Sequence, residues 1–109
     1  MRVPTLPSDD TSALIAALWE RNRPLVLARL QVLDRTAEVL AEGMLPEELQ
    51  AEAISIAHKL AGSLGMFGYP QGTALARELE RMLEQDTRPG AAEVRTRAEA
   101  LRRLLFPSD

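Results

Sequence analysis

The chain has 109 residues and a formal net charge of −3, with no cysteine and a single histidine, His58. Its length suits one domain. The absence of cysteine excludes disulfide scaffolds, thiol catalysis and cysteine-ligated zinc, and one histidine excludes HExxH and multi-histidine metal centres. We therefore expect no metal and no cofactor, while apolar residues, at 46% of the chain, suffice for a folded core.

The N-terminal third of the chain predicts a tail followed by a long helical segment. Leucine and alanine dominate and only 4% of residues are aromatic, which favours helices over sheets. Residues 1–10 are polar and contain prolines, so we expect a flexible tail there. Helical periodicity then runs from about Thr11 to Glu42. Because Pro24 inside a helix would cost about 3 kcal/mol, we expect a short additional N-terminal helix or a kinked first helix, with the break near Asn22–Pro24.

Three more helices are predicted, over Pro46–Phe67, about Gln71–Gln85 and about Ala91–Phe106, with a turn at Thr87–Gly90. Short connections make consecutive helices antiparallel neighbours. We therefore predict an all-α, antiparallel up-and-down four-helix bundle, formed by a single domain over 11–106 and followed by a C-terminal tail over 107–109. The predicted inward positions of the first two bundle helices are Val26, Leu30, Leu33, Ala37, Leu40, Met44, Leu49, Ala53, Ile56, Leu60, Leu64 and Phe67.

Two classes of partner are not expected. The longest unbroken apolar run, Ala13–Trp19, is far shorter than the roughly 20 residues of a membrane-spanning helix. Basic residues are scattered among acidic ones rather than clustered as in a nucleic-acid footprint. We expect a soluble cytoplasmic protein that binds neither membranes nor nucleic acid.

His58 is predicted to point away from the core, because Ile56 and Leu60 are each turned about 200° from it on a helix. Its helical neighbours are small or short, apart from one isoleucine, and they include two mid-helix glycines that each cost about 1 kcal/mol against alanine. Two explanations stay open: close helix packing around a buried structural histidine in an interaction or dimerisation module, or a histidine kept reachable for a second protein. These neighbours are Ile54, Ser55, Ala61, Gly62 and Gly65.

A resemblance to a known family bears on this choice. The runs AHKLAGSLGMFG (57–68) and LARELERML (75–83) resemble the signature of histidine-containing phosphotransfer (HPt) domains. That signature has a histidine, a leucine two residues on, glycine at four, a small residue at five and glycine at ten, then a Leu-Glu-type pair in the next helix. The matching positions are His58, Leu60, Gly62, Ser63, Gly68, Leu79 and Glu80.

The resemblance implies a phosphorelay intermediate. His58 would accept a phosphoryl group from a histidine kinase or a receiver-domain phosphoaspartate and pass it to an aspartate of a response-regulator receiver. Such a carrier is not a kinase, and the chain has neither GxGxxG nor GxxxxGK[ST] for ATP. The partner would supply magnesium and an acidic pocket, and the carrier would be a monomer. The expected partner-binding residues are Ile54, Ser55, Ala61, Gly62, Gly65 and Met66.

Two further site residues follow from the same resemblance, together with one departure from it. Glu80 would orient the imidazole through its second ring nitrogen, or else be a solvated residue of a charged helix face. HPt domains usually carry Lys or Arg three residues after the histidine, where this chain has Ala61. Lys59 is the nearest cation for a phosphoryl group, and Arg77 on the next helix is another. A degenerate domain that binds receivers without transfer is therefore a third hypothesis.

Overall fold

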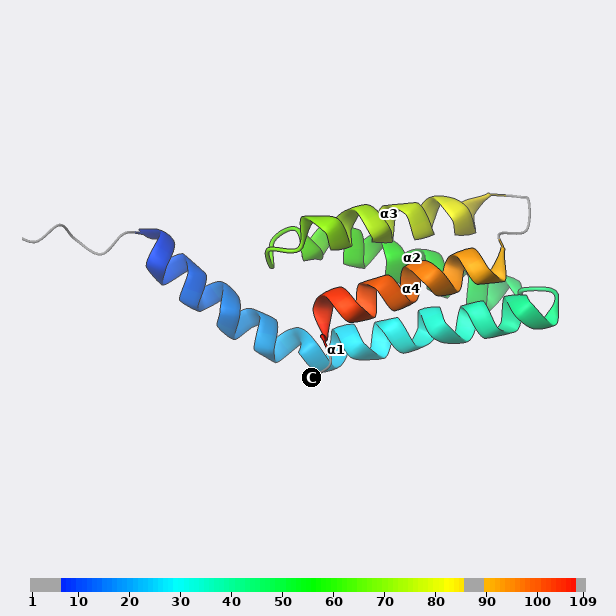
Figure 1. Ribbon diagram of the computed structural model, residues 1–109, viewed down its shortest axis with the longest axis horizontal. Coiled ribbons are helices and arrows are strands. Elements are labelled where there is room, and N and C mark those ends of the chain that lie inside the picture. The colour runs from blue at the N-terminus through cyan, green and yellow to red at the C-terminus, as the bar shows by residue number, and fades with distance from the viewer. Residues whose placement is uncertain (1–6, 86–89, 108–109) are drawn as a thin grey trace, which may run out of the picture.

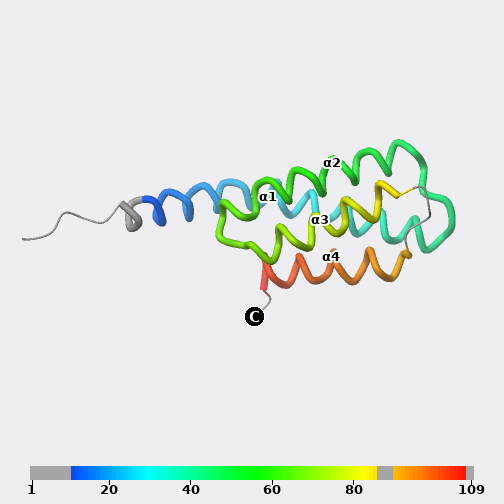
Figure 2. Tube along the Cα trace, turned by 90° about the horizontal axis from the view of Figure 1, so that it is seen from above, coloured from blue at the N-terminus to red at the C-terminus, as the bar shows by residue number. Residues whose placement is uncertain are grey.

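The computed structural model describes residues 7–85 and 90–107, which form four helices: α1 (Pro7–Glu42), α2 (Glu47–Leu64), α3 (Pro70–Glu84) and α4 (Ala91–Leu105). Figure 1 shows that consecutive helices run in alternating directions along the long axis, and Figure 2 shows α3 between α2 and α4. Neighbours in the ring are α1–α2, α2–α3, α3–α4 and α4–α1. The predicted antiparallel four-helix bundle is confirmed.

α1 is one helix that continues through Pro24 rather than two helices. Figure 1 shows that it changes direction between its N-terminal part, in blue, and its C-terminal part, in cyan. Proline lacks the amide proton of the helical ladder and clashes with the preceding turn, which accounts for a bend at this position. Of the two expected arrangements the structure has the kinked first helix, and its N-terminal part extends beyond the bundle.

Helix ends follow local sequence. Gly43 directly follows α1 and Gly68 ends the turn after α2; their φ values of 142° and 89° lie in a region that favours glycine. Glu47 and Glu48 place negative charge in the first turn of α2, and Pro70 lies at the start of α3.

α1 begins at Pro7, inside the segment expected as a tail. Residues 1–6 of that tail, most of the expected turn at 87–90 and residues 108–109 lie outside the described ranges.

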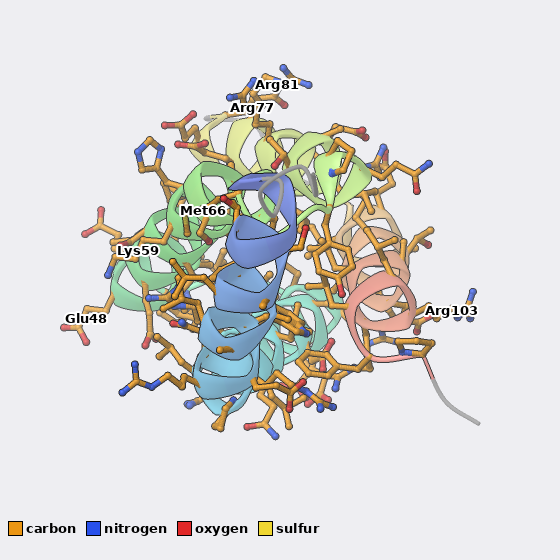
Figure 3. The ribbon with its side chains drawn as sticks, turned by 90° about the vertical axis from the view of Figure 1, so that its left-hand side faces the viewer. Glu48, Lys59, Met66, Arg77, Arg81 and Arg103 are labelled. Atoms are coloured by element: carbon orange, nitrogen blue, oxygen red, sulfur yellow. The ribbon has the colours of Figure 1, made fainter. Side chains whose placement is uncertain are left out.

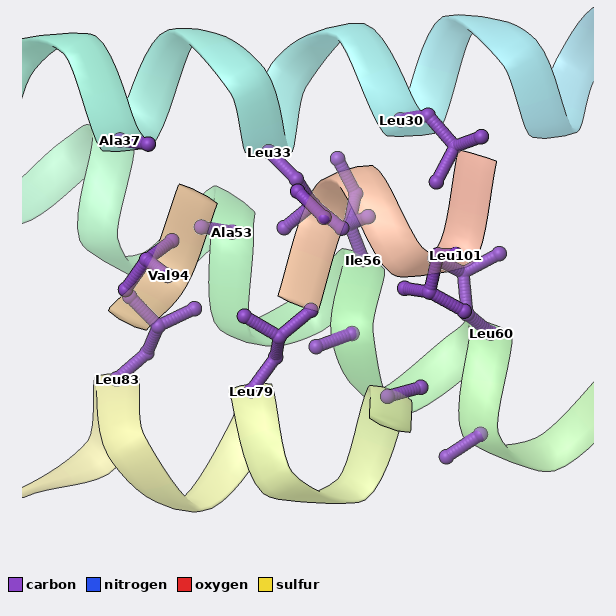
Figure 4. Packing of buried hydrophobic residues seen from close by; sticks show 14 of the residues in the cluster. Leu30, Leu33, Ala37, Ala53, Ile56, Leu60, Leu79, Leu83, Val94 and Leu101 are labelled. Atoms are coloured by element: carbon purple, nitrogen blue, oxygen red, sulfur yellow. The ribbon is translucent and has the colours of Figure 1, made fainter. Parts of the chain in front are cut away.

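The core lies between the four helices and contains mainly leucine and alanine (Figure 4). All predicted inward positions of α1 from Val26 to Leu40 are buried, as are Leu60 and Leu64 of α2. Met44 is a wrong prediction: its side chain is 78% exposed, because Gly43 ends the helix and breaks its periodicity. Thr36, buried between the leucines, satisfies its hydroxyl by donating to the Val32 carbonyl at 2.8 Å.

An aromatic cluster closes one end of the bundle. Trp19 packs against Phe67, Tyr69 and Phe106, with ring centroids 5.4, 5.3 and 5.8 Å away. The Arg23 guanidinium lies 5.5 Å from the centre of the Phe106 ring. The cluster joins the bend region of α1, the α2–α3 connection and the end of α4, and so fixes the end of α2 that follows His58.

Candidate functional site

His58 lies on the solvent side of α2. Its side chain is 75% exposed, whereas the residues before and after it in the core pattern, Ala57 and Leu60, are fully buried. The predicted direction of His58, away from the core, agrees with this exposure. The alternative of a structural histidine predicted a buried ring, and the structure contradicts that feature.

One ring nitrogen of His58 contacts α3. The distance from Nδ1 to Glu80 Oε2 is 2.8 Å, and the Glu80 side chain is only 19% exposed. An ionised carboxylate can only accept, so in the neutral ring Nδ1 carries the proton and donates it to Glu80. The lone pair of that ring is then on Nε2, which makes no hydrogen bond to any of the described residues. The contact joins two of the predicted site residues.

Small side chains on one edge of α2 bring α3 close enough for this contact. Ala53, Ala57 and Ala61 are buried at four-residue intervals, and Gly65 continues the series. A Cβ atom added to Gly65 would lie 3.4 Å from the Thr73 hydroxyl of α3, and one added to Gly72 would lie 2.9 Å from the Leu64 side chain. Such residues let helix backbones approach closely. A glutamate on α3 therefore reaches a histidine on α2.

The two mid-helix glycines of α2 have different surroundings. A Cβ added to Gly62 would meet nothing within 4 Å, whereas Gly65 faces Thr73. The open space expected beside His58 is present at Gly62; Gly65 is exposed as well, but the Thr73 hydroxyl of α3 lies next to it. The sequence could not separate these two cases, because both glycines lie near the same helical direction as His58.

Ala61 requires a correction. It was expected on the exposed face, but only 8% of it is exposed, because three residues after His58 the helix has turned toward α3 and the core. Ile54 is half-buried and packs against the core edge. Ser55, Lys59 and Met66 are exposed as expected, with Met66 57% exposed.

The charged groups around His58 come from two helices. Figure 3 shows Lys59 extending from α2 on one side, while Arg77 and Arg81 extend from α3 on another. All three side chains are exposed, and none takes part in an ion pair within the described part of the chain. The surface around the histidine therefore receives positive charge from both helices, while Glu80 holds Nδ1 and Glu84, one turn further along α3, is also exposed.

Near Met66 the surface is hollowed. A hollow of about 390 Å³ is lined by Met66, the α2–α3 connection and the overhanging part of α1. Its residues are Ser12, Ile15, Ala16, Trp19, Met66, Phe67, Gly68 and Tyr69. Sequence reasoning did not find this feature, because it combines segments that are distant along the chain.

Sequence reasoning also missed Gln50 at the other end of the α2–α3 pair. Its side-chain amide donates to the Leu83 carbonyl in the last turn of α3 at 2.7 Å. The bond satisfies a carbonyl at a helix end that has no partner within its own helix. No periodicity or local motif signals this contact, since it depends on how two helices are aligned.

Residues 7–85 and 90–107 contain no group of three or more histidine, aspartate or glutamate side chains placed to hold a metal ion. Over the same ranges no helix is long and apolar enough to cross a membrane.

Comparison with known proteins gives two findings. The family model for the Hpt domain matches residues 13–105. Protein RcaC of Microchaete diplosiphon is 36% identical over 81 residues, which are 72% of this chain and 12% of that protein, so the chain corresponds to only a small part of this relative. No solved structure matches the chain with significant similarity. The family match, which extends over all four helices, shows that the chain belongs to the Hpt domain family, whose members carry phosphoryl groups in two-component phosphorelays and are not kinases.

Proposed function

We propose that His58 is the phosphoacceptor of this domain. It takes a phosphoryl group from a histidine kinase or from the phosphoaspartate of a receiver, and gives it to an aspartate of a response-regulator receiver. One observation carries the proposal: the ring is 75% exposed while Nδ1 is held by Glu80, so that Nε2 is the accessible nitrogen. Family membership supports it independently.

The chemistry needs little from the carrier itself. The Nε2 lone pair attacks the phosphorus of the donor, and the new N–P bond forms as the donor's own bond to phosphorus breaks. From a receiver phosphoaspartate the P–O bond breaks and the carboxylate leaves with the bonding electrons; from a kinase phosphohistidine the P–N bond breaks and the imidazole leaves with them. The Nδ1 proton stays in place, and Glu80 stabilises the positive charge that develops on the ring. In the onward step an aspartate oxygen attacks the same phosphorus, the N–P bond breaks, and its electron pair returns to Nε2, which restores the neutral ring with its proton on Nδ1. Positioning and electrostatics are the main contributions to such transfers.

The partner is proposed to dock on the exposed side of α2 around His58. Ser55, Lys59 and Met66 are exposed there, and Gly62 leaves space above the helix backbone. The partner's aspartate must come within bonding distance of Nε2, which a bulky side chain at Gly62 would prevent. Gly65 and Ala61, in contrast, contribute through the packing of α3.

The test is transfer from a receiver phosphorylated with acetyl phosphate. We expect the wild-type domain to gain an acid-labile, alkali-stable label, as a phosphoramidate does, and His58→Gln to gain none. Circular dichroism should show unchanged helicity in the variant, since the replaced side chain is outside the core. Glu48→Gln, at an exposed position in the first turn of α2, is the matched control and should label as the wild type does. Labelling of His58→Gln would refute the assignment.

A second candidate is a domain that binds receivers without transfer. The observation in its favour is Ala61, a short buried side chain where HPt domains usually have a cation. This candidate predicts a stable complex with the receiver and no label on the wild-type domain. The same experiment, with a binding measurement added, separates the two functions.

A further inference from the structure

The alignment of α2 and α3 can be followed residue by residue. His58 contacts Glu80, and Gly65, seven residues further along α2, lies against Thr73, seven residues back along α3. The two helices are antiparallel and have the same rise per residue. Each step toward the C-terminus of α2 is therefore matched by one step toward the N-terminus of α3 over this region.

This alignment places Arg77 level with Ala61. Each lies three residues from the contacting pair, Ala61 after His58 and Arg77 before Glu80, which is a rise of about 4.5 Å along both helices. Glu80 lies at the edge of α3 that contacts α2, and Arg77 is turned about 60° from it toward the solvent. Ala76, Leu79 and Leu83 are buried on the other side of Glu80. Arg77 thus lies at the outer rim of the same helix seam.

We infer that Arg77 binds the phosphoryl oxygens on His58 and takes the role of the cation missing at position 61. The inference rests on the proposed phosphorylation of His58. The buried methyl group of Ala61 carries no charge and does not extend over the seam, so the Arg77 side chain has access across it. A guanidinium donates two parallel N–H groups to phosphate oxygens. Its lack of an ion pair within the described residues leaves those donors available.

Lys59 has a different position relative to the ring. It is one residue after His58 and is turned about 100° away on α2, whereas the small edge residues face α3. Figure 3 shows Lys59 and Arg77 on different sides of the α2–α3 pair. Lys59 supplies a mobile point charge from the outer side, and Arg77 supplies directed hydrogen bonds from the seam.

Phosphoramidate, a small-molecule donor, tests this without a partner protein. Its P–N bond breaks, ammonia leaves and the phosphoryl group is transferred to the ring nitrogen. We expect Arg77→Ala to lower the labelling rate by about fivefold, the upper range for an exposed charge pair, and to shorten the lifetime of the phosphorylated form. The labelling rate of Arg77→Lys should lie between the rates of Arg77→Ala and the wild type. Arg103→Ala removes an arginine of α4 whose side chain is 82% exposed, and should have no effect.

A double variant tests whether returning a cation to this level of the seam restores the labelling rate. Ala61→Lys in the Arg77→Ala background should restore the rate, because it returns a cation to the same level of the seam; thermal unfolding checks that it folds. A wild-type rate for Arg77→Ala, or an equal loss for Arg103→Ala, would overturn the inference while the phosphoacceptor assignment stands. If wild-type His58 takes no label from phosphoramidate or from a phosphorylated receiver, the proposed function itself fails.

Discussion

The side of α2 that faces α3 and the side that faces solvent differ in how far they restrict the size of their residues. The edge toward α3 has Ala53, Ala57, Ala61 and Gly65, all of them small, at the interval that forms a continuous ridge. The open face has Ser55, His58, Lys59, Gly62 and Met66, which share exposure but little else. The packed edge determines where α3 lies, and with it which carboxylate reaches the histidine. The open face determines only what a partner meets. Stability and transfer should therefore respond separately to substitutions on the two surfaces.

The largest effect is expected from Leu60→Ala on the core side of α2. Leu60 is fully buried, and replacing such a leucine leaves a cavity that costs about 2–5 kcal/mol of unfolding free energy. Ser55→Ala on the open face is the control and should change it by at most about 0.5 kcal/mol. Denaturant unfolding measures both. Equal effects would mean that the two surfaces are not distinct.

Leucine at the two glycines should give opposite results. At Gly65 the first added carbon would already lie 3.4 Å from the Thr73 hydroxyl of α3, so the rest of a leucine side chain has to find room against α3, and overpacking of this kind costs about 1–3 kcal/mol. It should also push Glu80 away from His58, which the ring nitrogen resonances would report. At Gly62 there is space for the first added carbon, so stability should hold while transfer from a receiver slows. Unchanged transfer in Gly62→Leu would count against docking on this face.

A smaller effect is expected from Gln50→Leu. The substitution removes the bond from the side-chain amide to the Leu83 carbonyl, and one such bond contributes about 0.5–1.5 kcal/mol. The end of α3 should then exchange its amide protons faster than the rest of that helix. Gln31→Leu, at an exposed position of α1, serves as the control. A uniform change over all helices would show that Gln50 does not act on α3 specifically.

The smallest effect should be a gain. Gly62→Ala reduces the backbone freedom of the unfolded chain, and its methyl group has space, so the unfolding free energy should rise by about 0.5–1 kcal/mol. Gly43→Ala should lower the unfolding free energy, because φ at this position is +142°. Thermal unfolding of the two variants tests whether glycine at position 62 keeps His58 accessible to a partner rather than stabilising the fold. Destabilisation by Gly62→Ala would show that the helix needs glycine there for another reason.

Much of the fold follows from helical periodicity and helix-ending residues. Val26, Leu30 and Leu33 are buried where spacing by three and four places them, and Gly68 ends the turn after α2. The prediction that Met44 points inward was wrong because helical periodicity does not extend beyond the residue at which a helix ends. The bend in α1 was predicted as a choice between two arrangements, since Pro24 weakens a helix without deciding whether surrounding turns hold it together.

The candidate site divides in the same way. The sequence by itself determined that His58 points away from the core, because direction around a helix depends only on position along it. Only the tertiary structure decided that Glu80 contacts the ring, that Gly65 but not Gly62 lies beside a side chain of α3, that Ala61 is buried, and that Arg77 lies level with it. These facts depend on the distance and alignment between α2 and α3. Both are determined by packing that involves the whole bundle, so no segment read alone contains them.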